Sequence, residues 1–307
     1  MYQTTLLKEF SFSGVGLHSG KEMGVRVLPA PADTGVQFCR TDVKNCPFER
    51  ASPFNVTFTQ LATTISCCDF PISTIEHLAS ALYGLGVDNV FVEVDGPEIP
   101  ILDGSAVPIS SLIACAGIVT LDVKRKYLII KRPVEIEIDD KLVRGDAYDG
   151  LEITFAIDYS HEAIRCKKRS ITLSPELYYN TIANARTFGF KKDVEMLWNM
   201  GLAKGGSLDN AIVLDDKDGI LNPGGLRHSN EFVSHKILDL IGDISLTGYR
   251  LLGHIYAVKS GHHLNNLFAR RLVESMNSYR ITELEDHNPT YGYLTHQDRA
   301  APAMHNA

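Results

Sequence analysis

The chain has 307 residues, of which 44% are hydrophobic and 22% are charged, and its formal net charge at pH 7 is −7. This composition is typical of a globular protein with a sizeable core, and it excludes a chain that is disordered over most of its length. The negative charge excludes a general nucleic-acid-binding protein, because binding to phosphates needs a basic surface.

No segment of the sequence has the pattern of an export signal or of a membrane span. Residues 1–14 lack a basic stretch followed by an apolar one, and the most apolar run, residues 112–121, is too short to cross a bilayer. The 6 cysteines include no CxxC pair, and the neighbours Cys67 and Cys68 are a poor metal motif. We therefore expect a cytoplasmic protein whose thiols stay reduced and have structural or incidental roles.

Short alternating or β-branched segments dominate the first third of the chain and predict strands. They lie at residues 9–12, 23–27, 55–58, 62–65 and 90–94. Residues 13–20 contain glycines that suggest a dinucleotide-binding fingerprint, but Ser19 stands where its third glycine is needed, and a strand follows where the fingerprint requires a helix. These residues therefore predict a hairpin turn. Ser73 to Glu76 has the form of a capping box, and apolar residues at helical spacing follow it, which predicts a helix ending at Gly84 or Gly86.

A similar series of elements follows in the second half. Strands are predicted at residues 127–130, 134–138 and 151–157, helices at 175–185 and 231–248, and a last strand at 251–262. In both halves a helix begins near a histidine and is followed by a glycine, a strand and a glycine turn. This weak repeat predicts an α+β protein with two domains of related topology, each a small sheet packed with helices. We expect domains at residues 1–124 and 125–283 with the active site between them, and a polar tail at 284–307.

The strongest chemical pattern is His235-x-x-x-Asp239 within the predicted helix 231–248. Residues four apart share one face of a helix, so this imidazole and this carboxylate could bind one cation, and Asp243 one turn further on could support the site. A surface ion pair is the alternative. A zinc hydrolase needs a third protein ligand, and the sequence leaves it open among four histidines in or beside turns and helix starts. These are His18, His77, His262 and His263.

Two further segments allow two interpretations each. Glu76 either closes the capping box or, beside a metal ligand, accepts a proton from water, and from the pattern alone we favour the cap. Residues 192–201 place Val194, Leu197, Trp198 and Met200 on a short helix. Such side chains usually pack into the core, but they could instead line an apolar slot for a chain-like ligand.

Long stretches of both halves together resemble the UDP-3-O-acyl-N-acetylglucosamine deacetylases, zinc enzymes of lipid A biosynthesis in Gram-negative bacteria. The stretches are GVGLHSG, ATTI, STIEHLASALYGLGVDNVFVEVDGPEIPILDGSA, ARTFGF, GLAKGGSLDNAIV, LNPGGLRHSNEFVSHKILDLIGD and SGHHLNN, in the order of the family between residues 14 and 266. Matches of this length are far more specific than one short motif. The resemblance implies two α+β domains of related topology, each with an insert near the active site.

The resemblance also implies roles for individual residues. It makes His77, His235 and Asp239 the ligands of one zinc ion per chain. Glu76 corresponds to the general base. His262 corresponds to the general acid, or to a group that stabilises the developing charge.

Further positions follow from the same resemblance. Asp243 would orient His262, while Lys236 and Thr187 would lie beside the metal, with Thr187 helping to hold the oxyanion. Phe188 and Tyr159 would contact the sugar nucleotide, where Tyr159 replaces a phenylalanine of the family. The insert, at about residues 190–213, would form an apolar passage for the acyl chain that includes Val194, Leu197 and Ala203.

The implied reaction is hydrolysis of the N-acetyl group of UDP-3-O-acyl-N-acetylglucosamine, which gives acetate and the free amine. We expect a monomer without a nucleic-acid partner. One alternative is a non-catalytic protein that binds UDP sugars or acyl chains, and another is a zinc deacetylase of a different N-acetylated sugar. The complete set of reactive side chains argues against the former, and the apolar insert argues against the latter.

Overall fold

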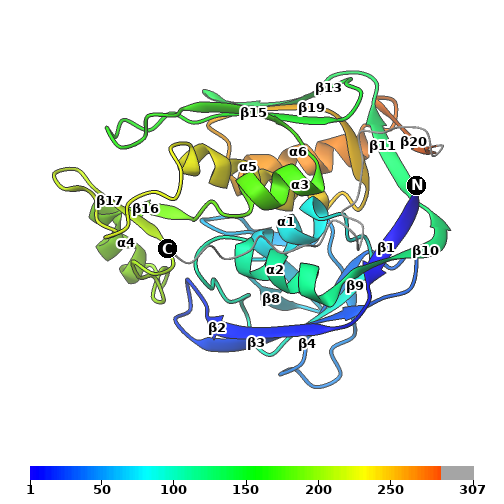
Figure 1. Ribbon diagram of the computed structural model, residues 1–307, viewed down its shortest axis with the longest axis horizontal. Helices are drawn as coiled ribbons and strands as arrows, with labels where there is room; N and C mark the ends of the chain where they lie inside the picture. The colour runs from blue at the N-terminus through cyan, green and yellow to red at the C-terminus, as the bar shows by residue number, and fades with distance from the viewer. Residues whose placement is uncertain (285–307) are drawn as a thin grey trace, which may run out of the picture.

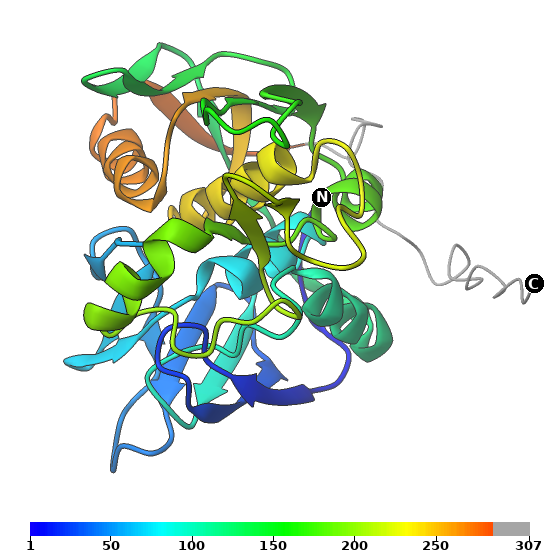
Figure 2. The same ribbon diagram turned by 90° about the vertical axis from the view of Figure 1, so that its left-hand side faces the viewer.

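A computed structural model of the chain describes residues 1–284, so the predicted tail from residue 285 onward lies outside the described residues. Two β-sheets form opposite outer layers, and the longer helices lie between them (Figures 1 and 2). This arrangement confirms the predicted α+β class. No helix within residues 1–284 has both the length and the apolar character needed to cross a membrane.

The first sheet is built from the first third of the chain. Its strands, in spatial order, are β2 (Phe10–Val15), β3 (Glu22–Pro29), β9 (Val90–Val94), β4 (Val36–Arg40) and β5 (Glu49–Arg50). The successive pairings are antiparallel, antiparallel, parallel and antiparallel. The turn between β2 and β3 is the predicted hairpin, because Val15 pairs with Glu22 across it.

The second sheet repeats this order with strands from the second half. They are β12 (Val134–Ile138), β13 (Lys141–Asp146), β19 (Arg250–Val258), β14 (Leu151–Ala156) and β15 (Lys168–Thr172). The pairings are again antiparallel, antiparallel, parallel and antiparallel. β11 (Lys126–Ile130) and β20 (Tyr279–Glu283) extend the sheet beside β19. The matching strand orders are what a repeat with related topology predicts, whereas the division of the chain at residue 124 stays a prediction.

Smaller strands complete the β-structure. β1 (Tyr2–Leu6) pairs with β10 (Ile118–Lys124). One three-stranded sheet contains β6 (Val56–Phe58), β7 (Thr64–Cys67) and β8 (Phe70–Ile72). Another contains β16 (Phe188–Phe190), β17 (Ile212–Asp215) and β18 (Gly219–Ile220). This last sheet and its neighbouring helix project at one end of the molecule, at the left of Figure 1.

The helices occupy corresponding places in the two halves. The longer ones are α1 (Glu76–Gly84), α2 (Val107–Ala116), α5 (Glu231–Ser245) and α6 (His262–Glu274). α1 and α2 flank β9 in the chain, as α5 and α6 flank β19. Two short ones are α3 (Pro175–Leu177), which continues as a π-helical turn (Tyr178–Ile182), and α4 (Val194–Asn199), which follows a 3₁₀ turn (Lys191–Asp193).

α1 and α5 pack directly against each other at a glycine. A Cβ atom on Gly242 would lie only 2.2 Å from the main-chain oxygen of Glu76, so no larger residue fits there without a shift of a helix. The contact brings the start of α1 beside the middle of α5. The buried apolar side chains of both halves form one continuous core around this pair.

Two sequence predictions about helices and one about a strand were wrong in detail. The capping box does not form, because Ile75 occupies the N-cap of α1 without a side-chain cap, and the Glu76 carboxylate accepts a hydrogen bond from the main-chain N–H of Thr63. The predicted helix 175–185 contains a π-helical turn. The predicted strand 251–262 ends at Val258, and His262 instead begins α6.

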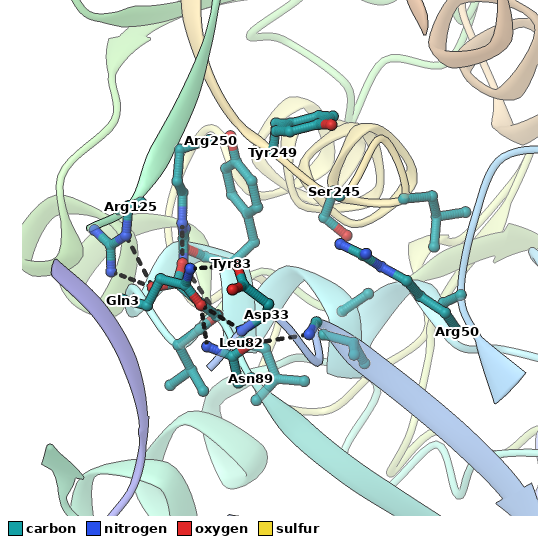
Figure 3. A pocket seen from close by; sticks show the side chains of 18 of the residues that line it. Gln3, Asp33, Arg50, Leu82, Tyr83, Asn89, Arg125, Ser245, Tyr249 and Arg250 are labelled. Carbon is teal, nitrogen blue, oxygen red and sulfur yellow. Dashed lines mark hydrogen bonds and ion pairs between the residues drawn. The ribbon is translucent and has the colours of Figure 1, made fainter. Parts of the chain in front are cut away.

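Opposite the start of α1, the two halves meet around Asp88. Its carboxylate binds Arg125 Nη2 at 2.6 Å and Arg250 Nε at 3.0 Å, beside a cavity of about 340 Å³ (Figure 3). It also accepts a hydrogen bond from the N–H of Thr4 in β1. One carboxylate thus joins β1, the junction between β10 and β11, and the start of β19.

Candidate metal centre and active site

Three buried side chains from α1 and α5 form a group that could hold a metal ion. Their ligand atoms, an imidazole nitrogen each from His77 and His235 and a carboxylate oxygen of Asp239, lie within 4.8 Å of one another. His235 Nε2 is 3.3 Å and His77 Nε2 is 3.9 Å from Asp239 Oδ1. His235 and Asp239 lie close together because they are four residues apart on α5. His77 joins them because α1 packs against α5.

The two imidazoles are neutral, which leaves a ring nitrogen of each free to bind a cation. His235 Nδ1 lies 3.0 Å from the carbonyl oxygen of Ala185, so the main chain can accept the Nδ1 proton while Nε2 faces Asp239. Burial, with His235 adding to it, lowers the pKa of His77 to about 3, and burial also lowers the pKa of His235. Two neutral imidazoles and one carboxylate therefore fit a divalent cation that takes nitrogen and oxygen ligands.

Lys236 fixes the carboxylate of this group. Its Nζ donates to Asp239 Oδ2 at 2.8 Å, which leaves Oδ1 facing the imidazoles. Burial alone would raise the pKa of Asp239, but His235 and Lys236 hold it well below its usual range. The carboxylate is therefore ionised at neutral pH.

Glu76 and His262 face each other beside this group. Their Oε1 and Nε2 atoms are 4.0 Å apart, and both side chains are buried. Burial raises the pKa of Glu76 to about 7, although His262 opposes the shift. Burial alone would lower the pKa of His262, but Asp243 and Glu76 raise it to about 9. A base whose pKa is near neutral and an acid whose pKa lies above it are suited to proton transfer at neutral pH.

Asp243 holds His262 through a network that the sequence did not reveal. Its Oδ2 accepts hydrogen bonds from His262 Nδ1 at 3.0 Å and from Asn265 Nδ2 at 2.8 Å, and its Oδ1 accepts one from Thr63 Oγ1 at 2.5 Å. Thr63 lies just before β7 and Asn265 in the first turn of α6. Both fall within stretches that carry the family resemblance, but neither belongs to a spacing motif.

All of the residues assigned by resemblance except Asp243 line one cavity of about 840 Å³. Thr187 is held by main-chain hydrogen bonds with Gly104 and Ile212, each 2.8 Å long. The Phe188 ring lies edge-on to Tyr159, with ring centroids 5.5 Å apart, and 6.3 Å from the His235 ring. An aromatic wall therefore adjoins the metal-binding group.

The insert forms the apolar end of the same cavity. Val194 and Leu197 of α4 and Ala203 after it line the cavity, and no residue of α4 is buried. Met196 and Trp198 are each 54% exposed and Met200 is 50% exposed. The core-packing interpretation of this helix was therefore wrong, because none of its side chains is buried.

The other two histidines considered as metal ligands lie on the cavity wall, outside the three-residue group. His18 Nδ1 accepts a hydrogen bond from the N–H of Ala203 at 3.4 Å, which ties the β2–β3 hairpin to the insert. His263 Nδ1 lies 3.4 Å from Thr59 Oγ1.

Comparison with known proteins gives consistent matches. The sequence pattern of the family described as UDP-3-O-acyl N-acetylglycosamine deacetylase matches residues 3–274. A UDP-3-O-acyl-N-acetylglucosamine deacetylase of Citrifermentans bemidjiense is 45% identical over 283 residues, which is 92% of either chain. Proteins of the same name from Thioalkalivibrio sulfidiphilus and Histophilus somni are each 46% identical, over 93% and 92% of this chain and 94% of each relative.

Proposed function

The chain belongs to the family of UDP-3-O-acyl-N-acetylglucosamine deacetylases, and on this basis we propose that it hydrolyses its substrate with one zinc ion bound by His77, His235 and Asp239. The chain is a hydrolase of lipid A biosynthesis that releases acetate from UDP-3-O-acyl-N-acetylglucosamine. The observation that carries the mechanism is the pair of Glu76 and His262, which faces the metal-binding group inside the large cavity.

An amide is a poor electrophile and water is a poor nucleophile, so the site must activate both. Zinc, when bound, acts as a Lewis acid that polarises the acetyl carbonyl and lowers the pKa of water. Glu76, with a pKa near 7, accepts the proton of the attacking water through Oε1, while Thr63 N–H holds Oε2. General-base catalysis of this kind contributes roughly 10²- to 10⁴-fold in rate.

His262 supplies a positive charge where negative charge develops during the reaction. In its protonated form it stabilises the oxyanion of the tetrahedral intermediate or gives its Nε2 proton to the departing amine. Its Nδ1 is held by Asp243 at 3.0 Å, so the charged form is favoured and the ring is oriented. Thr187 lines the same cavity, and in this proposal its hydroxyl donates to the oxyanion, while Lys236 keeps Asp239 ionised.

The cavity has a separate region for each of two parts of the substrate, the sugar nucleotide and the acyl chain. Phe188 and Tyr159 form an aromatic surface for the sugar nucleotide, and the uncovered apolar helix α4 suits an acyl chain. We place the reaction in the cytoplasm because its substrate is a nucleotide sugar. We also propose that the chain acts as a monomer.

The direct test measures acetate release from UDP-3-O-acyl-N-acetylglucosamine by the purified chain, before and after treatment with a chelator. Activity should disappear with the metal and return when zinc is added. His235→Ala should bind one zinc equivalent less than the unaltered chain and lose activity. Full turnover by the chelated enzyme would contradict the metal assignment, and the absence of turnover with zinc present would contradict the substrate.

The acyl-chain role of the insert has its own test. Val194→Gln places an amide in the apolar part of the cavity, so kcat/KM should fall about tenfold for the acylated substrate, which corresponds to about 1.4 kcal/mol. The unacylated analogue should be affected much less. Lys217→Gln, on the exposed β17–β18 turn, is a control that should change neither substrate. Equal losses on both substrates with Val194→Gln would remove this role.

A further inference from the structure

Cysteines far apart in the sequence gather where the β4–β5 loop meets the end of β7. Cys46 lies in the loop between β4 and β5, Cys67 ends β7, and Cys68 begins the β7–β8 turn. The sulfur atoms of these three residues all lie within 4.8 Å of one another. Cys39 lies next to this group without belonging to it, because its Sγ donates a hydrogen bond to the carbonyl oxygen of Cys46 at 3.1 Å. The expectation that Cys67 and Cys68 form no metal motif considered only their adjacency in the sequence.

The spacing of these sulfur atoms is that of ligands around one ion. A tetrahedral zinc ion with bonds of about 2.3 Å to sulfur separates its ligand atoms by about 3.8 Å. Cys46 Sγ and Cys67 Sγ are 3.7 Å apart, nearly twice the length of roughly 2.05 Å that a disulfide requires. The main-chain N–H of Arg40 also points at Cys46 Sγ, at 3.4 Å, as expected beside a metal-bound thiolate.

We propose that Cys46, Cys67 and Cys68 bind a second, structural cation of the thiophilic class, for which Zn²⁺ is the probe, and that Cys39 becomes the fourth ligand when its Sγ turns from the Cys46 carbonyl oxygen to the ion. Zinc sites with four protein ligands, most of them thiolates, are structural, whereas catalytic zinc sites leave one coordination position open for water. This group shares no residue with the group of His77, His235 and Asp239.

The turn that carries Cys68 supports a role for its sulfur. Cys68 and Asp69 have φ values of 50° and 69° and join β7 to β8, with Cys67 paired to Phe70. Two-residue turns with both φ angles positive favour asparagine, aspartate and glycine, so a cysteine at the first position has a backbone cost. Ligation of an ion gives a reason for its presence there.

The proposed ion would connect two segments of the first half of the chain. An ion would join the β7–β8 hairpin to the loop after β4. It would thereby hold Thr63, just ahead of β7, against Glu76 and Asp243.

The test counts zinc in a chain without the proposed catalytic metal. His235→Ala, purified in reductant without chelator, should retain about one zinc equivalent per chain. Adding Cys46→Ser and Cys67→Ser should remove it, whereas adding Cys115→Ser and Cys166→Ser should not. With Co²⁺ in place of zinc, only the chain with intact cluster cysteines should show thiolate-to-cobalt charge-transfer absorption.

A second measurement uses the unaltered chain and does not depend on the folding of variants. Zinc-loaded protein should protect Cys46, Cys67 and Cys68 from alkylation, and a chelator should remove the protection, with Cys115 reacting equally in both cases. No cysteine-dependent zinc in His235→Ala, alkylation indifferent to chelator, or a Cys46–Cys67 disulfide in a non-reducing peptide map would overturn the proposal. None of these outcomes bears on the deacetylase activity.

Discussion

At the scale of single residues, the role of Glu76 follows from where its two oxygens lie. Oε2 is occupied by the N–H of Thr63 at 3.0 Å, and Oε1 faces His262 Nε2 at 4.0 Å. Glu76→Gln keeps the shape and an oxygen for Thr63 but removes the proton acceptor. We expect kcat to fall by roughly 10²-fold or more, with metal content and thermal unfolding near those of the unaltered chain. A folded, metal-loaded variant with nearly full turnover would eliminate the general-base role.

The charge of His262 depends on Asp243, and this dependence should appear in the pH profile. The pKa of His262 is raised to about 9, so the protonated form prevails at neutral pH and activity should be lost as the pH rises through about 9. Asp243→Asn removes a charge that raises this pKa. The alkaline limb of kcat/KM should therefore move to lower pH, and activity should fall more at pH 9 than at pH 7.

A matched control separates charge from positioning. Asn265→Ala removes a hydrogen bond to Asp243 Oδ2 but keeps the carboxylate charge, so the alkaline limb should stay near its original pH even if the rate falls. Both variants are compared by kcat/KM across the pH range. An Asp243→Asn profile with an unmoved alkaline limb would show that another group sets it.

At the scale of elements, the contact between α1 and α5 determines the geometry of the site. Gly242→Ala places a methyl group about where the main-chain oxygen of Glu76 lies, since an added Cβ would be 2.2 Å from it. Backbone cannot move aside as a flexible side chain does, so we expect a loss of about 2 kcal/mol or more in the free energy of unfolding, and a lower kcat. Chemical denaturation and turnover measure the two effects.

Gly224→Ala is the control for this substitution. An added Cβ there would have nothing within 4 Å, and the backbone does not need a positive φ. Stability should change by less than about 0.5 kcal/mol, with activity unchanged. Equal effects of the two substitutions would show that the close contact at Gly242 is unimportant.

The same contact explains what the sequence could and could not predict. Strands such as β9 were predicted well because alternating side chains face opposite sides of a sheet. Spacing within one helix likewise predicted that His235 and Asp239 share a face. The third donor, His77, comes from another helix, and only the family resemblance identified it. The capping box failed because Thr63, from a different segment, binds the Glu76 carboxylate.

At the scale of the molecule, the repeated strand order places two similar halves face to face, with α1 and α5 between them. The site draws on both halves, so Thr63 and Asn265 meet at Asp243 although they are far apart in the sequence. Cys46 and Cys67 likewise meet only through the fold. Long-range contacts of this kind leave no periodic pattern, which is why composition and spacing could not reveal them.

The last prediction concerns the junction of the halves at the C-terminal end of α1, away from Glu76 at its start. Asp88 binds Arg125 and Arg250, and Arg250 also donates to the carbonyl oxygens of Tyr83 and Val87. Asp88→Asn removes the carboxylate that these two largely buried guanidinium groups share. Loss of one partner of a buried ion pair costs about 3 kcal/mol, so the midpoint of thermal unfolding should fall by on the order of 5 °C. Glu9→Gln, which breaks the exposed pair with Arg26, should leave the midpoint of thermal unfolding nearly unchanged, because solvent screens that pair. Because the junction lies away from the reacting groups, kcat of Asp88→Asn well below its unfolding temperature should stay within about twofold of the unaltered value. A variant that keeps full stability, or that loses turnover while folded, would show that Asp88 does not act by joining the halves.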